Sequence, residues 1–465
     1  RGSGFTSQCR YPKLRASTNE RSAMHEYILL VSDATGLHLS DGGQTALGLR
    51  PRCDDSCIWE WKDDKTLRNA ATGAMVSVAP SGEPSADDSA TAIDAVFGPG
   101  ASELASPAFR VLGDDSSLSG LGADRVFSAR QAPARLPSAY LAELEAQGWT
   151  VVENVMSPAM LTNLIANINR VRKKGADKEA KLRAGQDKRP YKSGDNIIRP
   201  RRLMDEGESF LGMTPAVAQA LMHPVSLWLL ESYLGVEDIH YCQCPGFTIL
   251  RPAEKAGDNT QVMPGGWHCD YPYPVNSETA AHTYMLGPEE FEKLDASIST
   301  RYPDWKQRRD RLGMQFNIAL TDFTPEAGST QFVLGSHEFE GPPPTEMNAI
   351  PTVAGEGPHK DVVQMSFPAG SGILYDSRTY HRSPPELNVS GRERWAMQTC
   401  IVPSFVRDLR ERDEKVESAD AFAGATRIHA ALTERELQDV MKMLCDDEFG
   451  QPRQDVAAAV AASRA

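Results

Sequence analysis

The sequence predicts a mostly β protein with flanking helices, in which a jelly-roll core follows a smaller all-β module. Three observations support this fold class. Residues 25–130 are rich in short strand-like runs and contain an internal repeat. Residues 139–161 have the pattern of a helix, a strand and a second helix. From His240 onward strand patterns dominate, which suits a double-stranded β-helix, the cupin-like jelly-roll barrel that holds small ligands and metals at its mouth.

Length, charge and hydrophobicity bear on the number of domains and on whether nucleic acid or a membrane is a partner. The 465 residues are enough for two to three domains. With 49 basic and 63 acidic residues the net charge is −14 and the pI is about 5.3. Nucleic-acid binders usually carry a basic face, so we expect no nucleic-acid partner. No apolar run of about eighteen residues is present, and we therefore expect no membrane span.

The eight cysteines are scattered along the chain and form no dense framework. The pairs Cys53/Cys57 and Cys242/Cys244 lack a second pair at zinc-finger spacing, which argues against a zinc site. Reduced thiols are then the default, and they predict an intracellular, cytoplasmic protein. Residues 1–24 are a polar lead-in whose first residues look like a cloning remnant without an initiator Met, so the native N-terminus and any removed targeting peptide stay open.

The N-terminal region, residues 25–130, is predicted to be an all-β accessory module. Residues 35–40 are echoed by residues 72–77, and residues 61–67 by residues 112–118. Self-similarity at such a period indicates stacked β units. The stretch 59–69 also resembles fragments of a repeat from ricin-type β-trefoils, which often bind sugars. Because only fragments of the repeat are present, the prediction stays an all-β accessory module, with a trefoil-like fold and glycan binding as alternatives that the resemblance implies.

The remaining chain is predicted to be one large domain with a helical C-terminal extension. After the linker, a helix begins near Ala139 and a strand covers 148–155. A second helix follows, with Ser157 at its N-cap and Pro158 just inside. The predicted boundaries are 1–24, 25–130, 131–137, 138–425 and 426–465.

Three further segments of this domain have predicted roles. The charged stretch 173–202 is expected to be a solvated loop, or to offer one basic side chain to an anionic ligand. The insertion 286–313 is expected to be helical and to cover the metal end as a lid, with a dimer contact or surface decoration as the alternative. At the C-terminus we expect a helix over 434–444 and a frayed Ala-rich tail over 451–465.

The clearest candidate site begins at Trp267-His268-Cys269-Asp270. If this stretch is a β-strand, alternation sends His268 and Asp270 to the same side of the sheet. An imidazole and a carboxylate are two of the three ligands in a 2-His-1-carboxylate face, which suits non-haem Fe(II) with open positions. His381 is the best candidate for the third ligand, because the strand-like run 372–376 leads into a loop that would return this imidazole to the first pair.

Several ordered segments resemble the phytanoyl-CoA dioxygenase family of Fe(II)/2-oxoglutarate oxygenases. They are the segments 267–273, 319–337 and 381–383, followed by Asn388, Ser390, Arg394 and Ala396. The resemblance covers roughly residues 136–407. It implies that His268, Asp270 and His381 hold catalytic Fe(II), with 2-oxoglutarate and O₂ as cosubstrates. It also implies hydroxylation, or another oxidation, of an aliphatic C–H in a small or medium organic substrate, with release of succinate and CO₂.

The same resemblance assigns one carboxylate of 2-oxoglutarate to an arginine after the second histidine. The usual family spacing selects Arg392. Alignment of the nearby Asn, Ser and Ala instead selects Arg394 and implies a two-residue insertion near 384–386; we favour Arg394. Ser383 and Asn317 are further candidate contacts for the cosubstrate.

Asp270 bears on the type of reaction. Related radical halogenases have Gly or Ala at this position, which leaves a coordination place for chloride, so an aspartate favours hydroxylation. The alternative is a non-catalytic binding protein, in which a degenerate barrel carries a module for a glycan or protein partner. The sequence makes no prediction of the oligomeric state.

Overall fold

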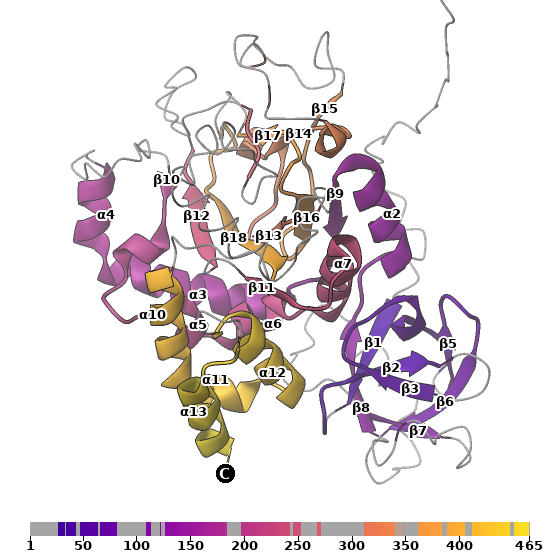
Figure 1. Cartoon of the computed structure of the whole chain (residues 1–465). Helices are drawn as coiled ribbons and strands as arrows, with labels where there is room; N and C mark the ends of the chain where they lie inside the picture. The colour runs from indigo at the N-terminus through magenta and orange to yellow at the C-terminus, as the bar shows by residue number, and fades with distance from the viewer. Residues whose placement is uncertain are drawn as a thin grey trace, which may run out of the picture.

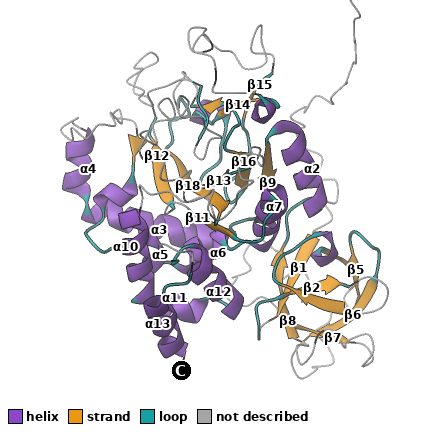
Figure 2. Ribbon diagram, in the orientation of Figure 1, coloured by secondary structure: helices purple, strands orange, loops and turns teal. Residues whose placement is uncertain are grey.

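The computed structural model describes residues 27–32, 34–42, 47–63, 66–80, 108–112, 121, 126–183, 197–241, 245–252, 267–270, 311–339, 343, 347, 361–383, 388–404, 412–446 and 451–464. These residues form three sheets, in which neighbouring strands are antiparallel, and several packed helices (Figures 1 and 2). The predicted combination of mostly β-structure with flanking helices is confirmed, and the structure adds that the sheets are antiparallel. Within the described residues, no helix is both long and apolar enough to cross a bilayer.

The N-terminal sheet closes on itself. Its strands are β1 (Tyr27–Ser32), β2 (His38–Asp41), β3 (Leu47–Arg50), β4 (Trp59–Asp63), β5 (Thr66–Asn69), β6 (Met75–Pro80), β7 (Ala108–Leu112) and β8 (Val126–Gln131). Strand β1 pairs with both β4 and β8, so β1, β4, β5, β6, β7 and β8 form a ring, from which the β2–β3 hairpin extends. Ile28, Leu30, Trp59 and Phe127 are among the side chains that fill the ring.

The internal repeat has a structural counterpart in two equivalent turns. Gly36 N donates to Ser32 O at 2.9 Å, and Gly73 N donates to Asn69 O at the same distance. Both glycines have a positive φ, 74° and 77°, which an L side chain rarely adopts. The echo between residues 35–40 and 72–77 therefore reflects one turn geometry used twice. The second echo, 112–118, lies outside the described residues beyond Leu112.

A larger and a smaller sheet form the core of the rest of the chain. The larger sheet has the order β10 (Ile197–Ile198), β12 (Gly246–Leu250), β18 (Arg394–Pro403), β13 (Met314–Ala319), β16 (Gly372–Asp376) and β9 (Trp149–Val152), with β11 (Ile239–Tyr241) also paired to β18. The smaller sheet has the order β15 (Val362–Gln364), β14 (Gln331–Val333) and β17 (His381–Arg382). An apolar cluster that includes Trp149, Phe332 and Ile373 joins the two sheets face to face.

Side-chain alternation gives the larger sheet two different faces. Along β13, Met314, Phe316 and Ile318 join the main apolar cluster with the helices. The intervening Asn317 faces the opposite side, because successive residues of a strand point to opposite faces. The same alternation on β12, β16 and β18 directs a set of polar side chains into the space between the sheets.

Helices cover the face of the larger sheet that lies away from β14 and β17 (Figure 1). The α-helices are α2 (Pro137–Gln147), α3 (Pro158–Lys174), α4 (Ala176–Arg183), α5 (Phe210–Met213), α6 (Pro215–Leu221), α7 (Pro224–Leu234), α10 (Arg412–Ala423), α11 (Thr426–Ala431), α12 (Glu434–Met443) and α13 (Gln454–Arg464). Short 3₁₀ turns are η1 (Asp55–Cys57), η4 (Pro200–Leu203), η5 (Pro325–Ala327) and η6 (Ser336–Glu338). The predicted cap of α3 is present, since Ser157 Oγ accepts from Met160 N at 3.3 Å.

Two predictions about helical segments were wrong. The charged stretch expected as a loop contains α4, which Arg172 ties to α3 through a 3.0 Å ion pair with Glu179. The tail expected to be frayed forms α13, because Val456 and Val460 are buried and Ser463 Oγ lies 2.8 Å from His429 Nδ1. The predicted helical insertion 286–313 lies outside the described residues up to 310.

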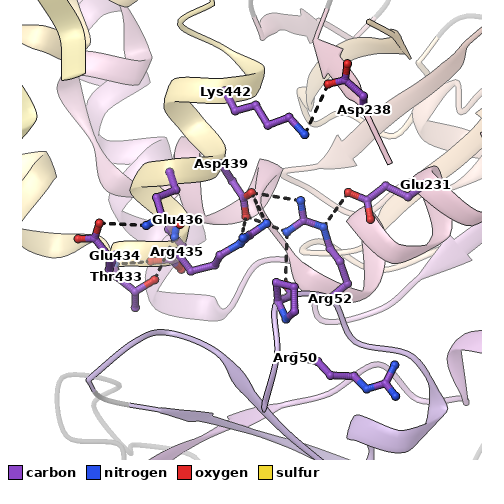
Figure 3. A network of polar contacts seen from close by, with 12 residues as sticks. Arg50, Arg52, Glu231, Asp238, Thr433, Glu434, Arg435, Glu436, Asp439 and Lys442 are labelled. Carbon is purple, nitrogen blue, oxygen red and sulfur yellow. Dashed lines mark hydrogen bonds and ion pairs between the residues drawn. The ribbon is translucent and has the colours of Figure 1, made fainter. Parts of the chain in front are cut away.

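The N-terminal sheet is held against the helices by both apolar and charged contacts. Leu29 of β1 joins the main cluster, while its neighbours Ile28 and Leu30 face the ring. Arg52 lies between carboxylates of two helices, with its Nε 2.9 Å from Glu231 of α7 and its Nη1 and Nη2 at 2.8 and 3.1 Å from the Asp439 carboxylate of α12 (Figure 3). This bidentate pair is largely buried, since Arg52 is 12% exposed and Asp439 4%.

Two neutral histidines are buried at the same contact. His223 caps α7, and its Nδ1 accepts from Ser226 N at 3.3 Å. His38 lies on β2, with its Nδ1 3.4 Å from Arg50 O. Burial, together with the positive charge of Arg130, lowers the pKa of each imidazole from 6.5 to about 3. Both side chains are therefore neutral in the folded protein at neutral pH.

We expect these histidines to make the protein less stable in mild acid. The unfolded chain takes up their protons near pH 6.5, whereas the folded chain does so only near pH 3. The contribution of these neutral histidines to the free energy of unfolding is therefore fully present above pH 6.5 and is lost as the pH falls toward 3. Each histidine should lower the free energy of unfolding by about 2 kcal/mol between pH 7 and pH 5. His223→Asn keeps a capping side chain but cannot titrate, so its denaturation midpoint should fall less than that of the wild type. An equal fall in both proteins would contradict the assignment.

We expect Arg52→Ala to destabilise the protein strongly. It leaves Glu231 and Asp439 buried without their main cation, although Arg435 still contacts Asp439 at 2.8 Å. The expected loss in free energy of unfolding is about 3 kcal/mol, measured by chemical denaturation. Arg50→Ala is the matched control, because Arg50 is 48% exposed and, among the described residues, forms its ion pair with the nearby Asp54; it should cost less than about 1 kcal/mol. Similar losses in the two variants would argue against the importance of the buried pair.

Candidate metal centre

The structure brings together the three predicted metal ligands. His268 and His381 pair backbone to backbone, each N donating to the other's O at 3.0 Å, and their rings lie 4.2 Å apart. Asp270 N donates to Ser377 O at 2.8 Å, which turns this carboxylate toward the same point. Donor atoms of His268, Asp270 and His381 all lie within 4.8 Å of one another. Two imidazoles and one carboxylate in this arrangement suit an octahedral Fe(II) with free positions.

The local backbone differs from the predicted strand. Within the described segment 267–270, His268 forms an isolated bridge with His381, and Cys269 and Asp270 are not in a strand. The segment extends the small sheet beyond β17 by this one bridge. The loop between β16 and β17 then provides the acceptor that positions Asp270.

Hydrogen bonds and charge prepare the histidine and the carboxylate for a cation. His381 Nδ1 lies 2.9 Å from Thr379 O, a carbonyl that can only accept, so Nδ1 carries hydrogen and Nε2 faces Asp270 at 3.2 Å. Burial opposes ionisation of Asp270, but His381 and His268 outweigh it and hold the pKa of this carboxyl well below its usual range. Burial likewise opposes protonation of His381, and Asp270 outweighs it to raise the pKa of the imidazole. The ionised carboxylate and the two imidazoles form a donor set that fits a divalent cation, which would displace the proton that Asp270 favours on His381.

Tyr375 completes the surroundings of Asp270. Its hydroxyl lies 2.9 Å from Asp270 Oδ2 and accepts from Asn317 Nδ2 at 3.3 Å. Burial and the Asp270 carboxylate raise the pKa of this phenol well above its usual value, so it donates to the carboxylate. Sequence reasoning missed Tyr375, although a tyrosine in the otherwise apolar run 372–375 was a usable signal.

A narrow cavity between the two sheets contains a buried arginine. Arg394 begins β18, and its Nη1 donates to Gly328 O. Its guanidinium lies 4.7 Å from the ring centre of Phe323. Among the described residues, its Nε has no hydrogen-bond partner and the guanidinium forms no ion pair. Burial lowers the pKa of Arg394 to about 10. An unpaired buried guanidinium is costly, so this cavity suits a carboxylate ligand.

The other predicted cosubstrate contacts divide into two groups. Asn317 lines the cavity with Arg394, and its buried Oδ1 has no partner among the described residues. Arg392 lies on an exposed turn before β18, and Ser383 is half-buried and does not line the cavity. The insertion expected near 384–386 lies outside the described residues. The structure therefore brings Asn317 and Arg394 together, but not Arg392 or Ser383.

Three polar residues of the cavity wall were missed by sequence reasoning. They are Thr248, Thr330 and Gln398. Thr248 and Gln398 are polar positions within the apolar strands β12 and β18, and Thr248 Oγ1 donates to Gln398 Oε1 at 2.6 Å. That pattern could have identified them, since a polar residue that alternates with buried apolar ones faces the opposite side of a sheet.

Comparison with known proteins identifies one family. A family model described as Phytanoyl-CoA dioxygenase (PhyH) matches residues 144–395. A curated relative, "Dioxygenase hkm4" of Aspergillus hancockii, is 30% identical over 139 residues, which is 30% of this chain. The match spans only 33% of that relative's own length.

Solved structures of low similarity include iron and 2-oxoglutarate enzymes. The epimerase SnoN from nogalamycin biosynthesis, solved with Fe³⁺, α-ketoglutarate and nogalamycin RO, is 15% identical with a TM-score of 0.35 and covers 58% of this chain and 84% of its own. HygX from Streptomyces hygroscopicus, solved with nickel and 2-oxoglutarate, is 13% identical with a TM-score of 0.36 and covers 59% of this chain and 90% of its own. At such TM-scores the family assignment depends on the family model alone.

We expect Arg394→Ala to raise the apparent KM for 2-oxoglutarate by about ten- to a hundredfold, because one charge-assisted carboxylate pair is lost. The exposed Arg392→Ala should change this constant by less than about twofold. Succinate release at varied 2-oxoglutarate concentration measures both variants. A larger effect of Arg392→Ala would show that the cosubstrate carboxylate binds elsewhere.

Proposed function

This chain belongs to the phytanoyl-CoA dioxygenase family of Fe(II)/2-oxoglutarate-dependent oxygenases, and from this premise we propose that it hydroxylates an aliphatic C–H of a small or medium organic substrate. Members of this family use Fe(II), 2-oxoglutarate and O₂. Together, when bound, these supply the oxidising chemistry and release succinate and CO₂, while the protein contributes binding and orientation. The reaction and the substrate class are our proposals.

His268, Asp270 and His381 would hold the iron. One observation carries the proposal: donor atoms of these three side chains converge within 4.8 Å. Facial binding by three protein ligands leaves the opposite positions for cosubstrate and O₂. Asp270 occupies the position that related halogenases leave to chloride, which supports hydroxylation over halogenation.

Arg394 and Asn317 would bind 2-oxoglutarate in the cavity between the sheets. The dicarboxylate has a charge complementary to the buried guanidinium, which otherwise has no anionic partner among the described residues. Thr330 and Gln398 line the same cavity and add polar groups. Hydrogen bonds connect this cavity to a metal ligand, since Asn317 Nδ2 donates to the Tyr375 hydroxyl at 3.3 Å and this hydroxyl donates to Asp270 at 2.9 Å.

We also propose that the two facing sheets form a double-stranded β-helix and that residues 25–130 are a separate module. The ring closure of β1 with β4 and β8 supports a barrel of trefoil type. The division at 131–137 agrees with the end of β8 at Gln131 and the start of α2 at Pro137. Glycan binding by this module stays a prediction, to be tested on a glycan array.

The ligand proposal is tested by His268→Ala, Asp270→Ala and His381→Ala. Each should abolish succinate release. Each should also weaken iron binding by more than the roughly hundredfold that outer partners of a metal site contribute. Iron retained after gel filtration and succinate formation are the measurements. His223→Asn is the control histidine variant, because it lies at the start of α7, and should keep both properties. Near wild-type turnover in any of the three alanine variants would remove that residue from the site.

A further inference from the structure

Tyr375 touches two of the three candidate metal ligands with different parts of its side chain. Its hydroxyl lies 2.9 Å from Asp270 Oδ2. Its ring meets the His381 ring edge to face, with centroids 5.0 Å apart. Strand β16 directs Tyr375 toward the small sheet, where the side chain is only 3% exposed. One buried residue thus contacts the carboxylate and one imidazole from the same side.

Further contacts hold the Tyr375 side chain in place. Phe332 lies edge to face with the Tyr375 ring at 5.0 Å and stacks on the His381 ring at 5.6 Å. Asn317 Nδ2 donates to the phenol oxygen at 3.3 Å, which leaves the phenol hydrogen for Asp270. Because Asn317 comes from β13 and Tyr375 from β16, the pair joins neighbouring strands of the larger sheet.

We propose that Tyr375, supported by Asn317, is a positioning residue that fixes the orientation of the Asp270 carboxylate for metal binding. This inference rests on the proposed function of the same site. The terminal torsion of an aspartate is broad, so the carboxylate does not by itself hold one plane. A donated hydrogen bond to one of its oxygens selects a plane and lowers the cost of ordering the ligand when a cation binds.

The same contacts link the metal ligands to the cavity. Asn317 lines the cavity with Arg394, and its Nδ2 donates to the Tyr375 hydroxyl. Loss of Asn317 should therefore affect both cosubstrate binding and, through Tyr375, the carboxylate. Loss of the Tyr375 hydroxyl should act first on the metal.

The test is Tyr375→Phe, which removes the hydroxyl and keeps the ring against His381 and Phe332. Metal-free protein is titrated with Mn(II) without cosubstrate, and free Mn(II) is followed by electron paramagnetic resonance. We expect the Kd for Mn(II) to rise by about ten- to a hundredfold, as for other lost outer partners of a metal ligand. This readout involves no turnover and separates positioning from chemistry.

Tyr241→Phe is the matched control. Tyr241 is fully buried on β11, and its hydroxyl donates to Leu221 O at 2.6 Å, a backbone carbonyl of α6. This variant loses a buried hydrogen bond just as Tyr375→Phe does, and a general loss of stability should appear in both melting curves. Its Kd for Mn(II) should stay within about twofold of the wild type.

An unchanged Mn(II) Kd in folded Tyr375→Phe, or an equal rise in Tyr241→Phe, would overturn the inference and leave the proposed function intact. If Tyr375→Phe does not fold, Asn317→Ala decides, with an expected rise of about two- to tenfold; no rise there overturns it as well. If wild-type protein binds no Mn(II), the metal site fails, and the proposed function fails with it.

Discussion

The candidate site depends on the backbone pairing between residues 267–270 and the loop that ends at His381. Reciprocal hydrogen bonds join His268 to His381, and Asp270 N reaches Ser377 O. The loop itself is organised by Asp376, a buried carboxylate that accepts from Arg378 N at 2.8 Å, from the Arg378 guanidinium and from Tyr233 OH. Ligands far apart in the chain thus meet because one satisfied carboxylate holds the turn between two strands.

Helix α7 connects this loop to the N-terminal sheet. Glu231 receives the Arg52 guanidinium from the sheet side, and two residues later Tyr233 donates to Asp376 at 2.8 Å. Arg311 adds a contact over the Tyr233 ring at 4.3 Å. Helix α7, which contacts the N-terminal sheet, therefore also contacts the loop between β16 and β17 that positions Asp270.

Arg52, Arg378 and Arg394, three arginines with little exposure, differ in their ionic partners. Arg52 has Glu231 and Asp439, Arg378 has Asp376, and each has a pKa raised by these carboxylates against the effect of burial. Arg394 has no such partner among the described residues, and burial lowers its pKa to about 10. Arg394 thus differs from Arg52 and Arg378, and under the proposed function this difference leaves its guanidinium for a carboxylate of the cosubstrate.

The sequence by itself determined the local features, because caps and strand alternation depend on neighbouring residues. Ser157 and Pro158 predicted the start of α3, and the turns at Gly36 and Gly73 appeared in the sequence as an internal repeat. The ordered motif containing His268, Asp270 and His381 also indicated the family. Residue type and spacing suffice for such features, since the same chemistry needs the same ligands.

Only the tertiary structure decided which side chains from distant segments come into contact. Arg394 lies in the cavity and Arg392 on the surface because β18 begins at Arg394, a register that depends on pairing with β12 and β13. Tyr375 reaches Asp270 because the small sheet lies over β16, and the Ala-rich tail is a helix because the core offers an apolar surface to Val456 and Val460. Each outcome depends on contacts between segments distant in the chain, which the local pattern can suggest but cannot determine.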